Sequence, residues 1–265
     1  MKHPQITKIY KYRDFTSRSL NMLANNELYF ANSGSFNDIF DCRARKEFEF
    51  KDDEDFVNKW TPLEASHQNI SIQNARSFVE HIVKNDHSKE KYIREKSEMF
   101  QKLVLQSFGI CSFSEISNDI LMWSHYSDSH KGFCIEFNRS PENMLAHANP
   151  IDYPEDDEFP YINYWLGPKN EAQLDEVKII ITTKSKHWKY EKEWRIVNRP
   201  QFIDEHYRGH TVEYSDEMIS GIIFGSRMDS KARTTIKNIM AGKPVTFYEA
   251  KPVKNKFCLE IIPTQ

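Results

Sequence analysis

A long, highly charged stretch interrupts this chain of 265 residues, which otherwise consists of short segments with the pattern of β-strands. Residues from about 52 to 106 favour helix and place apolar side chains at spacings near three and four, as amphipathic helices do. Many other segments alternate apolar and polar residues, which is typical of half-buried strands. We therefore expect an α+β fold with mixed, mostly antiparallel sheets of short strands.

The length of the chain suits a single domain, because one hydrophobic core can serve a chain of this size. We expect the stretch at about 52–106 to be a helical insertion in that domain. Residues from about 139 to 175 contain many prolines and a run of acidic residues, so they predict an irregular surface excursion or lid.

The net charge and the cysteine content indicate which partners and which cellular compartment suit this protein. The formal net charge is -3, which gives no long-range field for nucleic acid or for an anionic membrane. The four cysteines form no C-x-x-C pair and suit a reducing cytoplasm. No apolar run is long enough to cross a membrane, so we expect a cytoplasmic protein without a membrane partner.

The sequence Tyr190-Glu-Lys-Glu-Trp-Arg195 combines two carboxylates with an arginine and aromatic rings. In an extended strand Glu191, Glu193 and Arg195 share one face, with the carboxylates about 7 Å apart. This spacing suits acid/base chemistry or a polar ligand, and nearby rings can stack on a planar ligand or raise the pKa of a carboxyl group. The alternative is a solvated strand face whose charges screen one another.

A second motif is Leu121-Met-Trp-Ser-His-Tyr126, for which we expect a helix from about 118 to 127 with Ser117 as its N-cap. Leu121 and the two residues that follow it suit the core. His125 suits either a buried structural role or a role as proton carrier or ligand contact. A metal site is not expected, because neither H-E-x-x-H nor C-x-x-C occurs and no histidine pair at i, i+4 offers a closing ligand set.

Arg13 stands at the end of the first expected strand, where it suits either a phosphate or carboxylate ligand or an ion pair with Asp14 or Asp41. Asn37, Asp38 and Asp41 suit loop capping or catalysis. No G-x-G-x-x-G, P-loop or G-x-S-x-G motif occurs, which argues against Rossmann, kinase and α/β-hydrolase folds.

Six motifs in this order resemble a bacterial family of proteins known as domain of unknown function 2971. The resemblance spans nearly the whole chain and departs from the usual pattern at Ile39, where proline is common in the family. The family brings no established activity. The motifs are Tyr10-Lys-Tyr-Arg13, Phe36-Asn-Asp-Ile-Phe-Asp41, Cys111-Ser-Phe-Ser114, Leu121-Met-Trp-Ser-His-Tyr126 with Lys131-Gly132, Lys184 with Trp188, and Tyr190-Glu-Lys-Glu-Trp-Arg195.

The motif order also resembles that of ADP-ribosyltransferase-like folds, which have an early basic residue, a central aromatic residue and a late Glu-x-Glu. This resemblance implies that Glu193 is the principal catalytic carboxylate and that Glu191 positions or deprotonates an acceptor. It implies that Arg13 binds phosphate and that Tyr126 and His125 line a nicotinamide pocket. A carboxylate stabilises the cationic sugar that forms when nicotinamide leaves.

Our leading hypothesis is an ADP-ribosyltransferase-like enzyme that cleaves the nicotinamide–ribose bond of NAD, acting as a toxin or phage-defence effector. Its partners are then a small nucleotide and a macromolecular acceptor. The alternatives are a non-catalytic binding module and a nuclease or other hydrolase that uses Mg²⁺ on Asp38, Asp41 and the two glutamates. The expected site residues are Glu193 and Glu191 for catalysis and Arg13, Tyr12, His125, Tyr126, Trp123 and Arg195 for binding.

Overall fold

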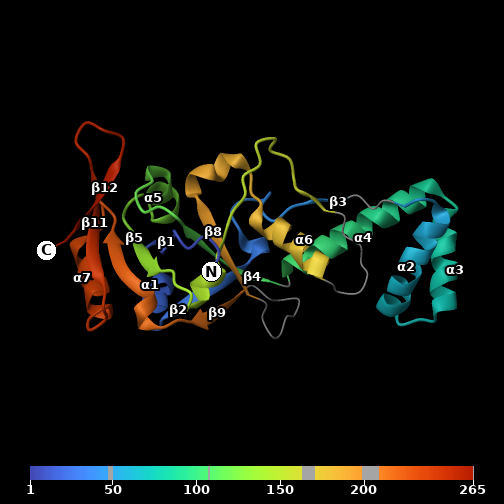
Figure 1. Cartoon of the computed structure of the whole chain (residues 1–265), viewed down its shortest axis with the longest axis horizontal. Helices are drawn as coiled ribbons and strands as arrows, with labels where there is room; N and C mark the ends of the chain where they lie inside the picture. The colour runs from blue at the N-terminus through green and yellow to red at the C-terminus, as the bar shows by residue number, and fades with distance from the viewer. Residues whose placement is uncertain (47–49, 107, 163–170, 199–208, 265) are drawn as a thin grey trace. The chain divides into compact units, whose positions relative to one another are not determined.

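The computed structural model describes residues 1–46, 50–106, 108–162, 171–198 and 209–264. These residues form one mixed and mostly antiparallel sheet of ten strands, together with a two-stranded sheet and several helices (Figure 1). The expected α+β class is therefore confirmed.

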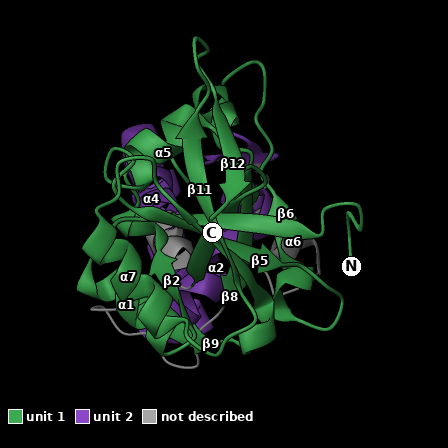
Figure 2. Cartoon of the chain, turned by 90° about the vertical axis from the view of Figure 1, so that its left-hand side faces the viewer, with its two compact units in different colours: residues 1–41, 106–157, 182–265 green, residues 42–105, 158–181 purple. Residues whose placement is uncertain are grey.

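The chain divides into two compact units, each built from segments that are far apart in the sequence. The first unit comprises residues 1–41, 106–157 and 182–265, and the second comprises residues 42–105 and 158–181 (Figure 2).

The large sheet belongs to the first unit. Its strands run in the spatial order β12-β11-β10-β5-β1-β4-β2-β9, while β8 pairs with β4 on one side and with β6 on the other. The paired strands are antiparallel, except that β10 and β11 are parallel. The strands are β1 (Lys8–Arg13), β2 (Glu27–Asn32), β4 (Gly109–Ser114), β5 (Phe133–Asn138), β6 (Asn149–Pro150), β8 (Glu193–Asn198), β9 (Gly209–Glu213), β10 (Ile219–Phe224), β11 (Thr246–Pro252) and β12 (Leu259–Pro263).

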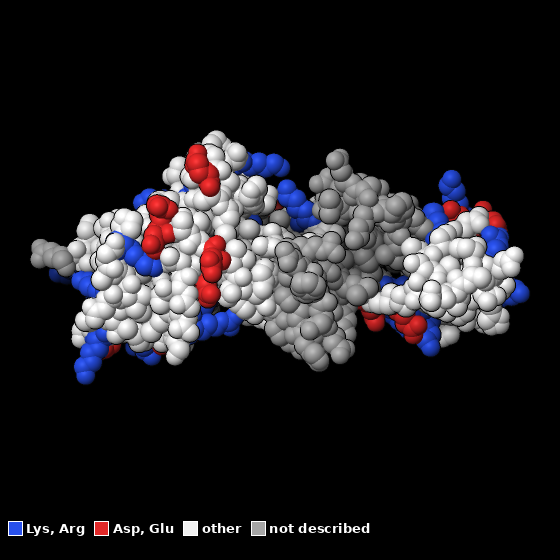
Figure 3. Space-filling model, turned by 90° about the horizontal axis from the view of Figure 1, so that it is seen from below, with Lys and Arg blue, Asp and Glu red and all other residues white. Residues whose placement is uncertain are grey.

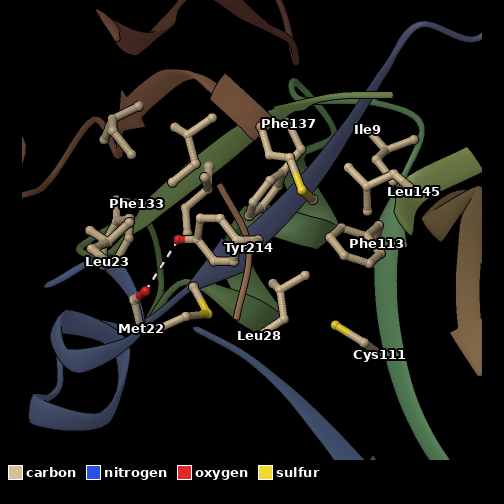
Figure 4. Packing of buried hydrophobic residues seen from close by; sticks show 14 of the residues in the cluster. Ile9, Met22, Leu23, Leu28, Cys111, Phe113, Phe133, Phe137, Leu145 and Tyr214 are labelled. Atoms are coloured by element: carbon tan, nitrogen blue, oxygen red, sulfur yellow. Dashed lines mark hydrogen bonds between the residues drawn. The ribbon is translucent and has the colours of Figure 1, made fainter. Parts of the chain in front are cut away.

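One face of the sheet carries the main hydrophobic core. Ile9, Phe113 and Phe137 pack there beside residues from two helices, α1 (Ser17–Ala24) and α7 (Ser230–Ile239) (Figure 4). Each fully buried side chain of this size stabilises the fold by about 1.5–3 kcal/mol. The short 3-10 helices of the unit are η1 (Ser33–Ser35), η2 (Met144–His147), η3 (Lys186–Glu191) and η4 (Asp216–Met218).

The opposite face carries a second cluster, in which Tyr12 of β1 and Ile223 of β10 pack against helix α5 (Ile120–Tyr126). The helix begins later than expected. Its N-cap is Asp119 rather than Ser117, because the Asp119 carboxylate accepts hydrogen bonds from the amides of the residues two and three positions later. Leu121, which we expected in the core, is 41% exposed.

The pairing of β1 with β4 is limited to Tyr10 and Ser114, whereas β1 pairs with β5 along its whole length. Further along, β4 pairs with β2 instead. The sheet is therefore split between β1 and β4. At this split the Lys11 ammonium donates a hydrogen bond of 2.7 Å to the backbone carbonyl of Ser112. A side chain thus replaces a backbone donor.

The second unit contains the charged stretch that we expected to be a helical insertion. Its helices bury an aromatic cluster that includes Phe56, Trp60 and Tyr92. In the expected irregular excursion the described residues include η2, β6, β7 and part of α6. The elements of this unit are β3 (Arg45–Lys46), α2 (Asp53–Gln68), α3 (Ile72–Val83), α4 (Asp86–Gln106), β7 (Tyr161–Ile162) and α6 (Glu171–Thr182), which ends at the boundary with the first unit.

Acidic and basic side chains are interspersed on the face drawn in Figure 3, so neither sign of charge dominates there. Among the helices of the described residues, none combines the length and apolar character that a membrane crossing requires.

Candidate functional site

A pocket lies at the split between β1 and β4, within the first unit. Five parts of the unit line it: β1, the loop that follows η1, β4, helix α5, and the segment from Lys184 into β8. These parts come from the beginning, the middle and the last third of the chain. The pocket therefore exists only once the sheet has formed.

Strand β8 supplies the most polar part of the pocket wall. Trp194 and Ile196 point into the main core, so Glu193 and Arg195 point to the other face. This alternation agrees with the sequence prediction. The solvated strand face that we considered as an alternative is not what forms, because Glu193 and Arg195 are buried.

Glu191 does not belong to the strand. It is the last residue of η3, and Lys192 after it has a left-handed backbone with φ 42°. The prediction of an extended backbone through Glu191 is therefore wrong. Nevertheless its side chain reaches the same pocket as Glu193, because a turn rather than a strand brings it there. The Ser114 hydroxyl fixes this turn by donating a hydrogen bond of 2.7 Å to the Glu191 carbonyl.

The Arg195 guanidinium joins two carboxylates. It donates to Glu193 through Nε and Nη2 at 2.7 and 3.0 Å, and to Asp41 through Nη1 and Nη2 at 2.8 and 2.6 Å. Both pairs are bidentate, the geometry in which arginine binds carboxylates most strongly. We expected Arg195 to bind a ligand, but the structure uses its donors to fix the loop that carries Asp41 to β8.

Lys184 adds a second buried cation. Its ammonium lies 2.5 Å from Glu191 Oε2, 3.1 Å from Glu193 Oε2 and 3.8 Å from Asp41 Oδ2. Burial by itself lowers the pKa of Lys184, but the carboxylates of Glu193 and Glu191 raise it above its ordinary value. Burial likewise raises the pKa of Glu193, yet Arg195 and Lys184 outweigh burial and lower it to about 2. Lys184, Glu193 and Arg195 are therefore charged at neutral pH.

Glu191 differs from Glu193 in the direction of its pKa shift. Its Oε1 accepts a hydrogen bond of 2.5 Å from the Tyr126 hydroxyl. Burial raises the pKa of Glu191, and the charge of Glu193 adds to this effect, so that the pKa stays above its ordinary value despite Lys184 and Tyr126. Of the two glutamates, Glu191 is therefore the one whose pKa lies nearer to neutral pH, which suits proton exchange.

Two cations on β1 have no acidic partner. Lys11 and Arg13 line the pocket, and neither forms an ion pair with a carboxylate in the described part of the chain. The Arg13 Nε atom is buried and has no hydrogen-bond partner among these residues. Burial lowers the pKa of both groups. Both side chains are half-buried, and a cation that is withdrawn from water without an acidic partner is unfavourable, so this part of the pocket suits an anion.

Helix α5 shows why some predicted residues meet the pocket and others do not. Met122 and Tyr126 are four residues apart and both line it, because such residues share a helix face. His125 lies next to Leu121 on the solvent face and is exposed. It is therefore neither buried, as a structural histidine would be, nor part of the pocket wall. Trp123 is fully buried, and its indole Nε1 donates to the Ser117 carbonyl at 2.8 Å rather than facing the pocket.

Tyr12 contributes to the pocket wall, but its hydroxyl donates to the backbone carbonyl of Ile116 at 2.9 Å. The structure therefore brings together Arg13, Tyr12, Tyr126, Glu191, Glu193 and Arg195, and it leaves His125 and Trp123 outside.

The sequence prediction missed Lys11 and Lys184 as site residues and gave Asp41 only a tentative metal or ion-pair role. Lys184 and Asp41 stood in the quoted motifs, so the motifs themselves carried a signal. The signal for Lys11 was weaker: it stands two residues before Arg13 and therefore lies on the same face of a strand.

The carboxylates of the pocket are poorly arranged for a metal ion. Asp41 and Glu193 already bind Arg195, and Asp38 does not line the pocket. Within the described residues, no group of three or more histidine, cysteine, aspartate or glutamate side chains is placed to hold a metal. Lys184 occupies the position between the two glutamates that a cation would take.

Fold and pocket together define an α+β protein with a network of buried charges beside an anion-attracting wall. Residues 122–196 match the model of a family described as "Protein of unknown function (DUF2971)", which confirms the resemblance to this family for the motifs within that range. The matched range contains Tyr126, Lys184 and the acidic motif, whereas Arg13 and Asp41 lie before it. No curated protein and no solved structure matches the chain.

Proposed function

We propose that the pocket binds a nucleotide and that the protein is an ADP-ribosyltransferase-like enzyme that cleaves the nicotinamide–ribose bond of NAD. The observation that carries this proposal is the convergence of Arg13, Tyr126 and the glutamates Glu191 and Glu193 on one pocket. These residues come from separate parts of the sequence, and each supplies one of the groups that the reaction needs.

The binding part of the proposal rests on the unpaired Arg13 and on aromatic rings. Arg13 suits a phosphate of the nucleotide because its guanidinium has no carboxylate partner in the described residues. Tyr126 and Phe36 line the same pocket and offer rings against which a planar base can pack.

The chemical part rests on the opposite pKa shifts of the two glutamates. Glu193 stays ionised because its pKa is about 2, since Arg195 and Lys184 outweigh the effect of burial. A fixed negative charge stabilises the cationic sugar that forms as nicotinamide leaves. Glu191 has a raised pKa, caused first by burial, and is suited to take a proton from the acceptor.

The wider role that we propose is that of a toxin or phage-defence effector with a macromolecular acceptor. The two alternatives predict different results. A metal-dependent nuclease is disfavoured, because the carboxylates it would use are paired with Arg195 and Lys184. A binding module without catalysis would bind the nucleotide and leave it intact.

The test is to incubate the purified protein with NAD and to quantify released nicotinamide by chromatography. We expect release by the wild type and a decrease in kcat of about 10²–10³-fold in Glu193→Gln, because one charge-stabilising group is lost while the side-chain shape is kept. Glu260→Gln, at an exposed position of β12, is the matched control and should not change the rate. Circular dichroism checks that each variant is folded.

The possible outcomes separate the hypotheses. Equal turnover in Glu193→Gln and the wild type would remove Glu193 from the mechanism. Binding of ADP-ribose by calorimetry without nicotinamide release would favour the binding module. Degradation of nucleic acid that depends on a divalent metal would favour the nuclease. If neither NAD nor ADP-ribose bound, the nucleotide proposal would be rejected.

A further inference from the structure

The pocket contains two lysines whose surroundings are opposite. Lys184 lies within 4 Å of three carboxylates, of which Glu191 at 2.5 Å and Glu193 at 3.1 Å are the nearest. These charges hold the proton on its nitrogen, and the pKa of Lys184 is raised even though burial opposes this. Lys184 is therefore an ammonium ion with no lone pair to offer.

Lys11 has no acidic neighbour at ion-pair distance among the described residues. Its Nζ atom donates to the backbone carbonyl of Ser112 at 2.7 Å and lies 5.0 Å from the centre of the Phe113 ring. Either an amine or an ammonium can donate to a carbonyl, so this contact does not require the charged form. The next residue on the same strand face is Arg13, which is also cationic.

The groups around Lys11 decide its protonation. Burial is the largest influence and lowers its pKa, and the charge of Arg13 on the same strand acts in the same direction. From β4 the Cys111 thiol and from β8 the Glu193 carboxylate oppose this, but the net pKa remains below its ordinary value. Glu193 forms its ion pairs with Arg195 and Lys184 rather than with Lys11.

We propose that Lys11 is a nucleophilic amine that forms an imine with an aldehyde or ketone bearing a phosphate or carboxylate group, and that Arg13 holds this anionic group. A half-buried lysine that lines a pocket beside another cation suits such chemistry, because the neighbouring charge favours the neutral amine. The neutral nitrogen attacks the carbonyl carbon, and its two hydrogens leave with the carbonyl oxygen as water. The product is a C=N bond, with no change in oxidation state and no further reactant.

This inference uses the surroundings of Lys11 and Arg13 and does not depend on NAD cleavage. Glu191 lines the same pocket and has a raised pKa, caused first by burial, so it is suited to supply a proton for the departure of water. The phosphate and carboxylate variants of the ligand share one chemistry, because arginine binds both in a bidentate manner.

The experiment uses pyridoxal 5′-phosphate as an aldehyde that carries a phosphate, with cyanoborohydride to reduce the imine to a stable amine. The full-length protein is treated at several pH values, and peptide mass spectrometry measures modification at Lys11, Lys184 and the exposed Lys254. Each unit by which a lysine pKa falls raises its neutral fraction at pH 7 about tenfold. The pKa of Lys11 is lowered, first by burial, and Arg13 holds the phosphate of the probe in the same pocket. We therefore expect several-fold more modification of Lys11 than of Lys184 and Lys254 at pH 7.

Two variants and two further probes complete the test. Lys11→Arg keeps the charge without a nucleophile and should abolish the dominant label, whereas Lys254→Arg should not. Arg13→Gln should reduce labelling by pyridoxal 5′-phosphate but not by pyridoxal, which lacks the phosphate. Glyoxylate, which carries a carboxylate, tests the other anionic group.

Labelling of Lys11 no greater than that of Lys184 or Lys254 would overturn the proposal, as would undiminished total labelling in folded Lys11→Arg. If Lys11→Arg did not fold, the ratio of labelled peptides in the wild type would decide by itself. Because NAD turnover is not measured, a negative result for nicotinamide release leaves this conclusion standing.

Discussion

Replacing Arg195 by methionine tests whether the buried charge network is held together as the structure indicates. Methionine is apolar and flexible, so it fills much of the space without supplying a charge. The change removes the four hydrogen bonds that Arg195 donates to Asp41 and Glu193, whose donor–acceptor distances are 2.6–3.0 Å.

The expected loss of stability is large because both carboxylates remain buried. Asp41 and Glu193 are only 7% and 4% exposed, so water cannot replace the guanidinium. Removing one partner of a buried ion pair costs about 3–5 kcal/mol. A typical free energy of unfolding is about 5–15 kcal/mol, so the variant should fold but with a much smaller margin.

The assay is urea denaturation of the wild type and Arg195→Met between pH 5 and pH 7. In the wild type the pKa of Glu193 lies near 2, because Arg195 and Lys184 outweigh burial, which alone would raise it from 4.5. This group therefore stabilises the wild type above pH 4.5, and the contribution is lost as the pH falls toward 2.

Without Arg195, burial has more influence and the pKa of Glu193 rises. A group with a raised pKa destabilises the folded state as the pH rises through that pKa. The difference in stability between Arg195→Met and the wild type should therefore shrink as the pH falls from 7 to 5. Adding Glu193→Gln to Arg195→Met should recover part of the loss, since the buried carboxylate that has lost its arginine, and keeps only Lys184, is then neutral.

The matched control is Arg45→Met, whose exposed ion pair with Glu158 should contribute less than about 1 kcal/mol. A loss in Arg195→Met as small as that of the control would refute the reasoning. So would a difference from the wild type that widened toward pH 5.

Two further predictions concern the walls of the pocket. The Tyr126 hydroxyl donates a hydrogen bond to Glu191 and thereby lowers the pKa of this glutamate, so Tyr126→Phe should raise that pKa. The acidic limb of the pH profile of nicotinamide release should then move to higher pH. A limb that did not move would contradict the role of Glu191 in proton transfer. Gly132→Ala would place a Cβ 2.1 Å from the Arg13 carbonyl oxygen and should lower the midpoint of thermal unfolding by several degrees. In the control Gly34→Ala the new Cβ meets only the Asn32 side chain, at 3.1 Å, and the midpoint should not fall. Equal midpoints for the two variants would count against the close approach at Gly132.

The sequence alone determined the local features of the fold. Alternation along 193–196 correctly placed Glu193 and Arg195 on one face of the strand, because the period of a strand depends only on its own backbone. The period of a helix is equally local, but it does not determine which face of the helix packs against the sheet. Leu121 and His125 lie on the solvent side of α5 for this reason, although we predicted a core position for Leu121 and a buried or site role for His125.

The tertiary structure decided what the site is. The split between β1 and β4 places Arg13 beside residues from more than a hundred positions later, and no local pattern encodes where a sheet divides. It also decided the charge states, because Glu191 and Glu193 are two residues apart yet differ in their neighbours. Electrostatic interactions depend on distance in space and on burial, and both are set only when the separate segments pack together.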